Sequence, residues 1–313
     1  MNDNLRHKGR LAQLGIYLGK FLRMFVYQND WKVIPIGAVI AGAVTFVVGQ
    51  NLFVTQEGTL MGAFALVCVC IWNGFFNSIQ VVCRERDIVK REHRAGLHMS
   101  AYIGAQMIYQ FLLCLVQTVV TLIICRFAGV HFPAYGIVTR WGVLDLGITI
   151  LLITYTADVL ALLVSCIVRN TTTAMTVMPF LLIFQMIFSG GLFDLSGPAE
   201  KLKVFTISHW GLDSLCAVGR YNDIPMVTLW NTIFKFRNIE YLGHKPLLEL
   251  IKEAEQRNLV QDFLLWSGSY NQNDAYASTT TNLLQNWGAL LILLAVFAVG
   301  AVIALEFVDR DKR

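Results

Sequence analysis

The sequence predicts an all-α integral membrane protein with six transmembrane helices. Of its 313 residues, 56% are hydrophobic and only 15% are charged. The mean hydropathy of +0.56 lies outside the range of soluble globular domains. Charge is also gathered into short segments. Glu57 is the only charged residue between Val33 and Val82, and none occurs between Ser100 and Cys125. Long apolar stretches separated by such segments are typical of helices that cross a bilayer.

The first part of the chain predicts an amphipathic helix. Residues 5–28 carry apolar side chains at helical spacing, and most of their basic residues fall elsewhere. This apolar stripe leads directly into the first apolar segment. We therefore expect residues 1–30 to form a helix on the cytoplasmic membrane surface, followed by a transmembrane domain over residues 31–313.

The six apolar segments each approach the ~20 residues needed to cross the hydrocarbon core. They lie at about 31–53, 59–82, 100–125, 143–168, 174–193 and 287–307. The link between the first two has no Lys or Arg and is assigned to the outside. Residues 194–286, of mixed polarity, then form a large extracytoplasmic segment between the fifth and sixth spans.

The segment Cys83–Gly96 is a run of charge between two of the most apolar stretches. Its basic residues are Arg84, Arg86, Lys90, Arg91 and Arg94, which place it on the cytoplasmic side. Asp87 can pair with Lys90 and Arg91, no Pro interrupts the run, and Gly96 supplies a stop, so residues 84–95 predict a short helix. We interpret this helix as a docking surface for a soluble partner. With basic residues also near both ends of the chain, both termini are predicted to be cytoplasmic in a multi-pass protein of the cell (plasma) membrane.

The sequence contains few signals for catalysis or cofactor binding. It has no GxxxxGK[ST] phosphate loop and no HExxH motif, so ATP or metal chemistry within the chain is not expected. His93 and His98 are five residues apart across Gly96, which is poor geometry for metal ligands on one helix, so no metal site is predicted. The basic residues lie in short loops and suit anionic lipid head groups, not nucleic acid. No catalytic residues are assigned.

Asp158 is the acidic residue well inside a predicted span, flanked by Thr154, Tyr155 and Thr156. A carboxylate in the membrane interior costs a few kcal/mol, so it is a candidate functional residue by default. It could accept a proton, contact a cationic substrate or lock the bundle by a hydrogen bond. Alternatively, it stays protonated and bonds a neighbouring backbone carbonyl. Both interpretations remain open.

Two spans carry large adaptable side chains beside isolated amides. They are Asn73, Phe75, Phe76 and Asn77 in the second span, and Met178, Phe184, Gln185 and Phe188 in the fifth. Such a mixture suits the wall of a cavity for a hydrophobic or amphipathic ligand. Hydrogen bonding between packed helices is the alternative role of the amides.

Three local patterns resemble the type-2 ABC exporter permease, most closely the G subfamily of ABC transporters. Glu85-Arg86, Arg91-Glu92 and Gly96, followed by Ala101-Tyr102, are similar to the pattern at that family's coupling helix. Met186–Leu192 resembles the family's FSG motif and hydrophobic plug. Ile207–Trp210, with Ala217, is similar to its re-entrant outer helices.

The resemblance implies a membrane subunit that works as a homo- or heterodimer with an ABC ATPase subunit. It implies coupling to the ATPase through Arg84, Glu85, Arg86, Arg91, Glu92 and Gly96, a substrate path along the second and fifth spans, and a gate at Gly191 and Leu192. The chain would hold no cofactor itself, since ATP and Mg would be bound by the ATPase, expected on a separate polypeptide. The substrate would be hydrophobic or amphipathic, a lipid, drug or peptide-like molecule, exported from the cytoplasm.

Two other functions are compatible with the residues. One is a proton-coupled secondary transporter that uses Asp158. The other is a membrane scaffold or receptor, without transport activity, whose outer segment 194–286 binds a ligand.

Overall fold

The computed structural model describes residues 9–27, 30–49, 51–191, 197–224 and 273–307, with residues 240–241, 245–246, 249, 253 and 257. Within these residues the protein is helical apart from one antiparallel pair of two-residue strands. The helices and strands are α1 (Arg10–Tyr27), η1 (Asp30–Lys32), α2 (Val33–Val48), α3 (Gln56–Ser78), α4 (Val81–Arg94), α5 (Met99–Phe127), α6 (Gly142–Ile167), α7 (Thr171–Ile187), α8 (Pro198–Leu202), η2 (Lys203–Phe205), α9 (Ile207–Val218), η3 (Tyr221–Asp223), β1 (Glu240–Tyr241), β2 (Lys245–Pro246), η4 (Asp274–Tyr276) and α13 (Thr280–Glu306).

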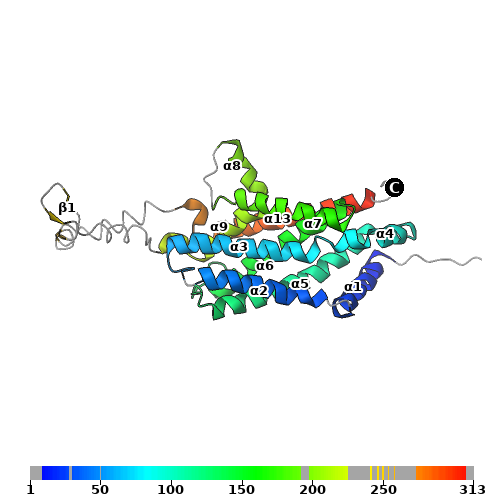
Figure 1. The fold of residues 1–313 in the computed structure, drawn as a ribbon, viewed down its shortest axis with the longest axis horizontal. Coiled ribbons are helices and arrows are strands. Elements are labelled where there is room, and N and C mark those ends of the chain that lie inside the picture. The colour runs from blue at the N-terminus through cyan, green and yellow to red at the C-terminus, as the bar shows by residue number, and fades with distance from the viewer. Residues whose placement is uncertain are drawn as a thin grey trace, which may run out of the picture.

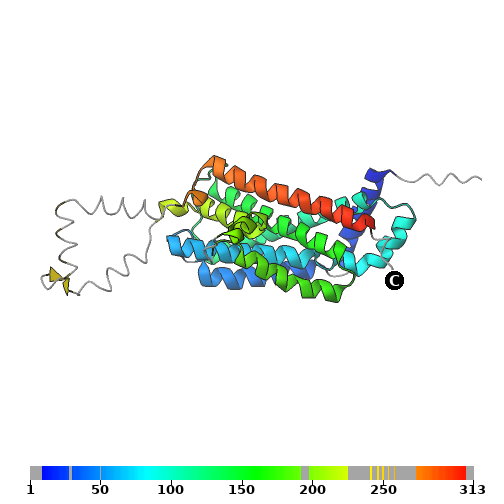
Figure 2. The ribbon, with the colours of Figure 1, turned by 90° about the horizontal axis from the view of Figure 1, so that it is seen from above.

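Within the described residues, four long and two shorter apolar helices run along the long axis of an elongated bundle (Figure 1). These helices are α2, α3, α5, α6, α7 and α13. The charged helix α4 and the amphipathic helix α1 lie at one end, where α13 also ends (Figure 2). The bundle therefore has one end rich in charge, and α9 packs in the other half.

Four helical segments are long and apolar enough to cross a membrane: Gln56–Arg94, Met99–Phe127, Gly142–Ile167 and Thr280–Glu306. Two shorter apolar helices, Val33–Val48 and Thr171–Ile187, accompany them within the described residues. Each predicted span overlaps one of these helices, but the bounds differ by up to seven residues, since α13 begins at Thr280 and the sixth span was predicted from residue 287. The expected span at 31–53, for example, is the 16-residue helix α2 with a turn after it.

The predicted boundary between the second span and the charged segment is a turn at residues 79–80, which separates α3 from α4. Thr55 begins α3 by accepting a hydrogen bond from the N–H of Gly58. Gly96, at φ +102°, follows the end of α4 in a conformation that favours glycine. The charged helix predicted at 84–95 is therefore observed, beginning at Val81 and ending at Arg94.

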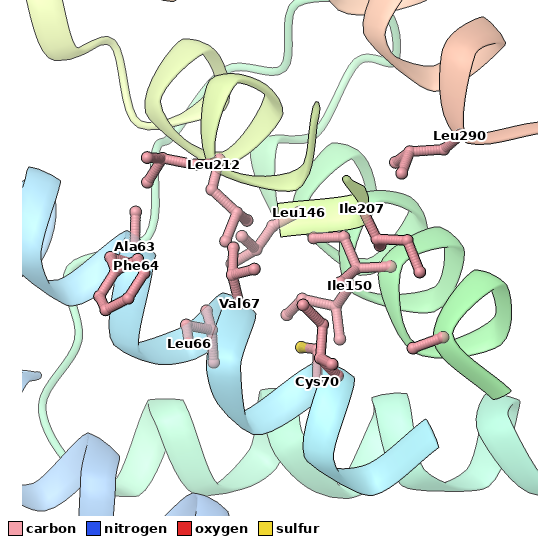
Figure 3. Close-up of a cluster of buried hydrophobic side chains, with 14 of the residues drawn as sticks. Ala63, Phe64, Leu66, Val67, Cys70, Leu146, Ile150, Ile207, Leu212 and Leu290 are labelled. Carbon is pink, nitrogen blue, oxygen red and sulfur yellow. The ribbon is translucent and has the colours of Figure 1, made fainter. Parts of the chain in front are cut away.

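The core of the bundle is the packing of α3 on α6, closed by α9 and α13 (Figure 3). Gly74 of α3 lies directly against α6, because a Cβ there would be 2.4 Å from the carbonyl oxygen of Thr154. Small residues allow such close helix contact in membranes. Leu212 of α9 lies beside Ala63 and Phe64 of α3, and Ile150 of α6 belongs to the same buried cluster.

Helix α9 is a short helix that follows α8 and η2, and it is almost wholly buried. The backbone N–H groups of Ile207 and Ser208, at the N-terminus of α9, donate to the side-chain oxygen Oε1 of Gln185 in α7, at 2.9 and 3.1 Å. The hydroxyl of Ser208 in turn donates to the backbone carbonyl of Gln185. An amide in an apolar helix thus completes the end of a second helix that has no side-chain cap of its own.

Candidate functional site

Helix α4 is attached to α1 by its acidic residues. Lys20 of α1 forms an ion pair with Glu85 at 3.2 Å, and the hydroxyl of Tyr17 donates to Glu92 at 2.7 Å. Partial burial beside Glu92 raises the pKa of Tyr17 well above its usual value, so this hydroxyl keeps its proton. Gln13 of α1 reaches the residues after α4, where it donates to the carbonyl of Gly96. Glu85 and Glu92 therefore face the amphipathic helix.

A second attachment joins the start of α4 to the end of α6. The hydroxyl oxygen of Ser165 accepts the N–H groups of Val82 and Cys83 at 3.0 and 3.2 Å. In the opposite direction, Nη1 of Arg86 donates to the carbonyls of Cys166 and Val168 at 2.8 and 3.0 Å. Each helix thus satisfies backbone groups that the other leaves open at its end. The result is a joint between α4 and α6 made of four hydrogen bonds.

The remaining face of α4 is exposed. Three neighbouring positions on this face lie at the surface: Asp87, Ile88 and, one turn later, Arg91. Arg84 is exposed one turn earlier, at the start of the same helix. A charged stripe with one apolar residue is thereby presented at the end of the bundle.

The six residues predicted for coupling thus divide by position. Arg84 and Arg91 are exposed, whereas Glu85, Arg86 and Glu92 bind α1 or α6, and the carbonyl of Gly96 is bound by Gln13. Ser165 was not predicted. Its only sequence signal is a hydroxyl near the end of a predicted span, which is common in membrane helices.

The predicted substrate-path residues are split between the interior and the surface. Asn73, Phe75, Asn77, Met178 and Gln185 are buried. The amide of Asn77 is paired in both directions with that of Gln117 in α5, at 2.8 and 3.0 Å. Asn73 packs on Gly37 of α2. Asn77 is thus hydrogen-bonded to a neighbouring helix, while its role in a substrate path stays a prediction.

The aromatic residues of the same two helices lie differently. Phe76 and Phe184 are each 37% exposed, and Phe188 is partly buried. Phe76 contacts the ring of Trp72, and Phe184 contacts that of Phe188. Since α3 and α7 also touch each other, they present an apolar surface outside this chain's own core.

Gly191 packs on α9. A Cβ at this position would be 2.6 Å from a terminal methyl of Leu212, so a larger residue here would require the leucine side chain to shift. Leu192, the other predicted gate residue, lies outside the described residues. The part of the predicted gate that the structure describes is therefore a contact between the end of α7 and α9.

Asp158 is fully buried between α6 and α3. Its Oδ1 accepts a hydrogen bond from Ser78 at 2.7 Å, close to the turn between α3 and α4. A second buried carboxylate, Asp145, was not predicted as a feature of the sequence. It accepts the backbone N–H groups of Ile137, Val138 and Thr139 and so holds the loop before α6.

A pocket of about 230 Å³ lies where α1, α3, α4 and α5 meet, with one residue each from α2 and α7. Of the predicted path residues, Phe76 and Asn77 line it. Its polar wall comes from Gln106 and Gln110 of α5, one helical turn apart, and Arg84 and Glu85 stand at the start of α4. The two glutamines were not predicted, although their four-residue spacing inside an apolar span is a visible signal.

Comparison with known proteins gives a family and one relative. A family model described as ABC-2 type transporter matches residues 21–201. The chain is also 25% identical over 150 residues to the ABC transporter ATP-binding/permease protein Rv1747 of Mycobacterium tuberculosis. That alignment covers 47% of this chain and 17% of the relative.

Proposed function

Because the chain belongs to the ABC-2 type transporter family, we propose that it is the membrane-spanning permease subunit of an ATP-driven ABC exporter. In this proposal α2 and α7 cross the membrane with the four longer helices, which gives six spans. The charged end of the bundle faces the cytoplasm of the cell, and a hydrophobic or amphipathic substrate moves outward. The resemblance of residues 85–102 and 186–192 to the G subfamily supports this direction.

The attachment of α4 is the observation that carries the proposal. A helix that receives force from a partner must pass it to the bundle without bending away. The four hydrogen bonds to α6 and the contacts of Glu85 and Glu92 with α1 supply that connection. The exposed residues Asp87, Ile88 and Arg91 then form the surface for an ATP-hydrolysing partner.

The printed name of the mycobacterial relative joins an ATP-binding and a permease function in one protein. This supports an ATPase as the partner of α4, which would bind ATP and Mg. The exposed aromatic residues of α3 and α7 support a second permease copy at that face, with the substrate path between the two copies. The rival use of Asp158 as a proton site has less support, because this carboxylate is bonded to Ser78 and does not line the described pocket.

The proposal is tested by asking whether ATPase activity co-purifies with the protein and whether that co-purification depends on the exposed face of α4. The full-length protein would be purified from its native membranes in mild detergent, and Mg-dependent ATP hydrolysis in the preparation measured. We expect Arg91→Glu to lower the accompanying activity about tenfold or more, since reversing a charge at an interface disfavours the partner. The matched control is Arg23→Glu, an exposed arginine on α1.

The control should keep the activity of the unmodified chain, and both variants should keep its unfolding temperature. Equal ATPase activity in Arg91→Glu and in the unmodified protein would contradict docking at this face. No accompanying ATPase in any preparation would contradict the proposed function as a whole.

A further inference from the structure

We propose that the pocket between α1, α4 and α5 is a binding site for the head group of a phospholipid that carries hydrogen-bond donors. The site does not depend on which substrate the protein transports. Most of its lining comes from α1, α4 and α5, and it borders the exposed face of α3 and α7 through Phe76 and Met175.

The first observation is a pair of unpartnered acceptors. Gln106 and Gln110 are each only 1% exposed and both line the pocket. The side-chain oxygen Oε1 of each has no hydrogen-bond partner within the described residues. Burying such a group without a partner destabilises the folded protein, because the group loses its hydrogen bonds to water. Two of them one helical turn apart therefore call for a ligand that donates hydrogen bonds.

The second observation is the charge at the pocket's edge. Arg84 lines the pocket and is exposed, and Glu85 is already paired with Lys20 at 3.2 Å. A guanidinium is well suited to bind a phosphate oxygen pair. A phosphodiester at Arg84 would leave the terminal ammonium or hydroxyl groups of the head group to reach the glutamine oxygens.

The third observation concerns size and the apolar walls. A volume of about 230 Å³ is smaller than that of pockets which enclose a whole drug-sized molecule, so it accepts a head group and not two acyl chains. Phe76 and Met175, both on the lining, are 37% and 40% exposed. Acyl chains can leave the pocket across these apolar side chains. A lipid therefore fits better than a soluble phosphate ester.

The position of the site suggests what the lipid does. The pocket touches the α3–α4 turn through Ile79 and Gln80, and the first turn of α4 through Val81. A bound head group would fill the space under the joint between α4 and the bundle. We infer that it stabilises this joint.

The experiment measures the unfolding temperature of the purified full-length protein in detergent with added lipid. Phosphatidylethanolamine and phosphatidylglycerol, whose head groups donate hydrogen bonds, should raise it above the value in phosphatidylcholine, whose head group has no donor. The double variant Gln106→Met, Gln110→Met keeps the side-chain length but removes both acceptors, and should abolish the difference among the lipids.

The matched control is Thr118→Val. Thr118 lies on the same helix with a buried unpartnered oxygen but does not line the pocket, so the lipid difference should persist in this variant. An equal effect of all three lipids, or a difference retained in the double variant, would overturn the proposal. A rise with phosphatidylglycerol alone would assign the effect to negative charge and overturn the role of the donors.

Two further measurements keep the test decisive. Soluble glycerophosphoethanolamine should not reproduce the effect at the same concentration, and an equal effect would overturn a lipid as the ligand. If the double variant does not fold, mass spectrometry of lipid bound to the unmodified protein decides. If the bound lipid is enriched in donor-bearing head groups relative to the total membrane extract, the site is supported. If the bound lipid has the same composition as the extract, the proposal is overturned.

Discussion

Arg86 is a basic residue of the charged segment whose side chain turns toward the bundle. Its guanidinium donates to two carbonyls at the end of α6, and Ser165 of α6 accepts two N–H groups at the start of α4. A row of charges in a sequence does not show which member faces a partner and which completes a helix end. This is why the sequence grouped Arg86 with Arg91, although the structure separates their environments.

Replacing Arg86 should destabilise the protein more than replacing Arg91. Arg86→Leu leaves the carbonyls of Cys166 and Val168 without this donor, and hydrogen bonds to charged groups contribute about 1.5–3 kcal/mol. Thermal unfolding in detergent measures the effect. Ser165→Ala should act in the same direction by about 1 kcal/mol, as loss of a helix cap does.

Arg91→Leu is the matched control, because this residue is exposed on the same helix. Its unfolding temperature should stay close to that of the unmodified protein. Equal destabilisation by the two arginine substitutions would contradict the structural role of Arg86.

His209 and Asp213 form a buried pair whose protonation changes with pH. Nδ1 of His209 lies 3.5 Å from Oδ2 of Asp213, one turn apart on α9. Burial lowers the pKa of His209 to about 4 and raises that of Asp213 to about 7, and Lys203 lowers both. Between these values both side chains are neutral, so their contact is not an ion pair there.

The two groups act on stability in opposite directions. The carboxyl of Asp213 stabilises the fold most below its unfolded pKa of about 3.9, and this contribution is lost as pH rises to about 7. For His209 the unfolded chain binds more protons between about pH 4 and 6.5, so the free energy of unfolding rises with pH there. The two slopes offset each other over that interval.

Asp213→Asn should uncover the slope of His209. We expect the unfolding temperature of this variant to rise between pH 4 and 6.5 more steeply than that of the unmodified protein. His209→Gln should show the opposite trend, a fall between about pH 4 and 7. Parallel curves for both variants and the unmodified protein would show that neither group titrates as inferred.

At the scale of helices, α4 was predictable because charge, helix formers and a terminal glycine agree over Cys83–Gly96. The reciprocal capping with α6 was not, because Ser165 and Arg86 are 79 residues apart in the chain. The burial of α9 could not be predicted from the sequence either. Its burial depends on Gln185 of α7 and on the core formed by α3 and α6.

The amides show the same limit. Periodicity placed Asn77 on a helix, but only the arrangement of α3 and α5 shows that Gln117 pairs with it. In apolar helices, polar residues are equally suited to bond a neighbouring helix or to line a cavity. Gln117 and Gln110 take these two roles on one helix, and their sequence context is alike.

For the whole molecule, the charged end and the opposite end of the bundle should lie on different sides of the membrane. Six of the seven cysteines are buried and Cys68 is partly buried, so a cysteine introduced at the surface can be labelled selectively. Arg10 is exposed on α1 at the charged end. Asp223 is exposed in η3, which contacts the start of α3 at the other end.

A maleimide that does not cross membranes should label Asp223→Cys in intact cells and Arg10→Cys only after permeabilisation. The basic residues of α4 and of the neighbouring chain ends favour the cytoplasm, and α3 separates them from η3 by the length of a span. The unmodified chain gives the background from native cysteines. Labelling of Arg10→Cys in intact cells would reverse the orientation, and a soluble ATPase could then no longer reach α4 from the cytoplasm.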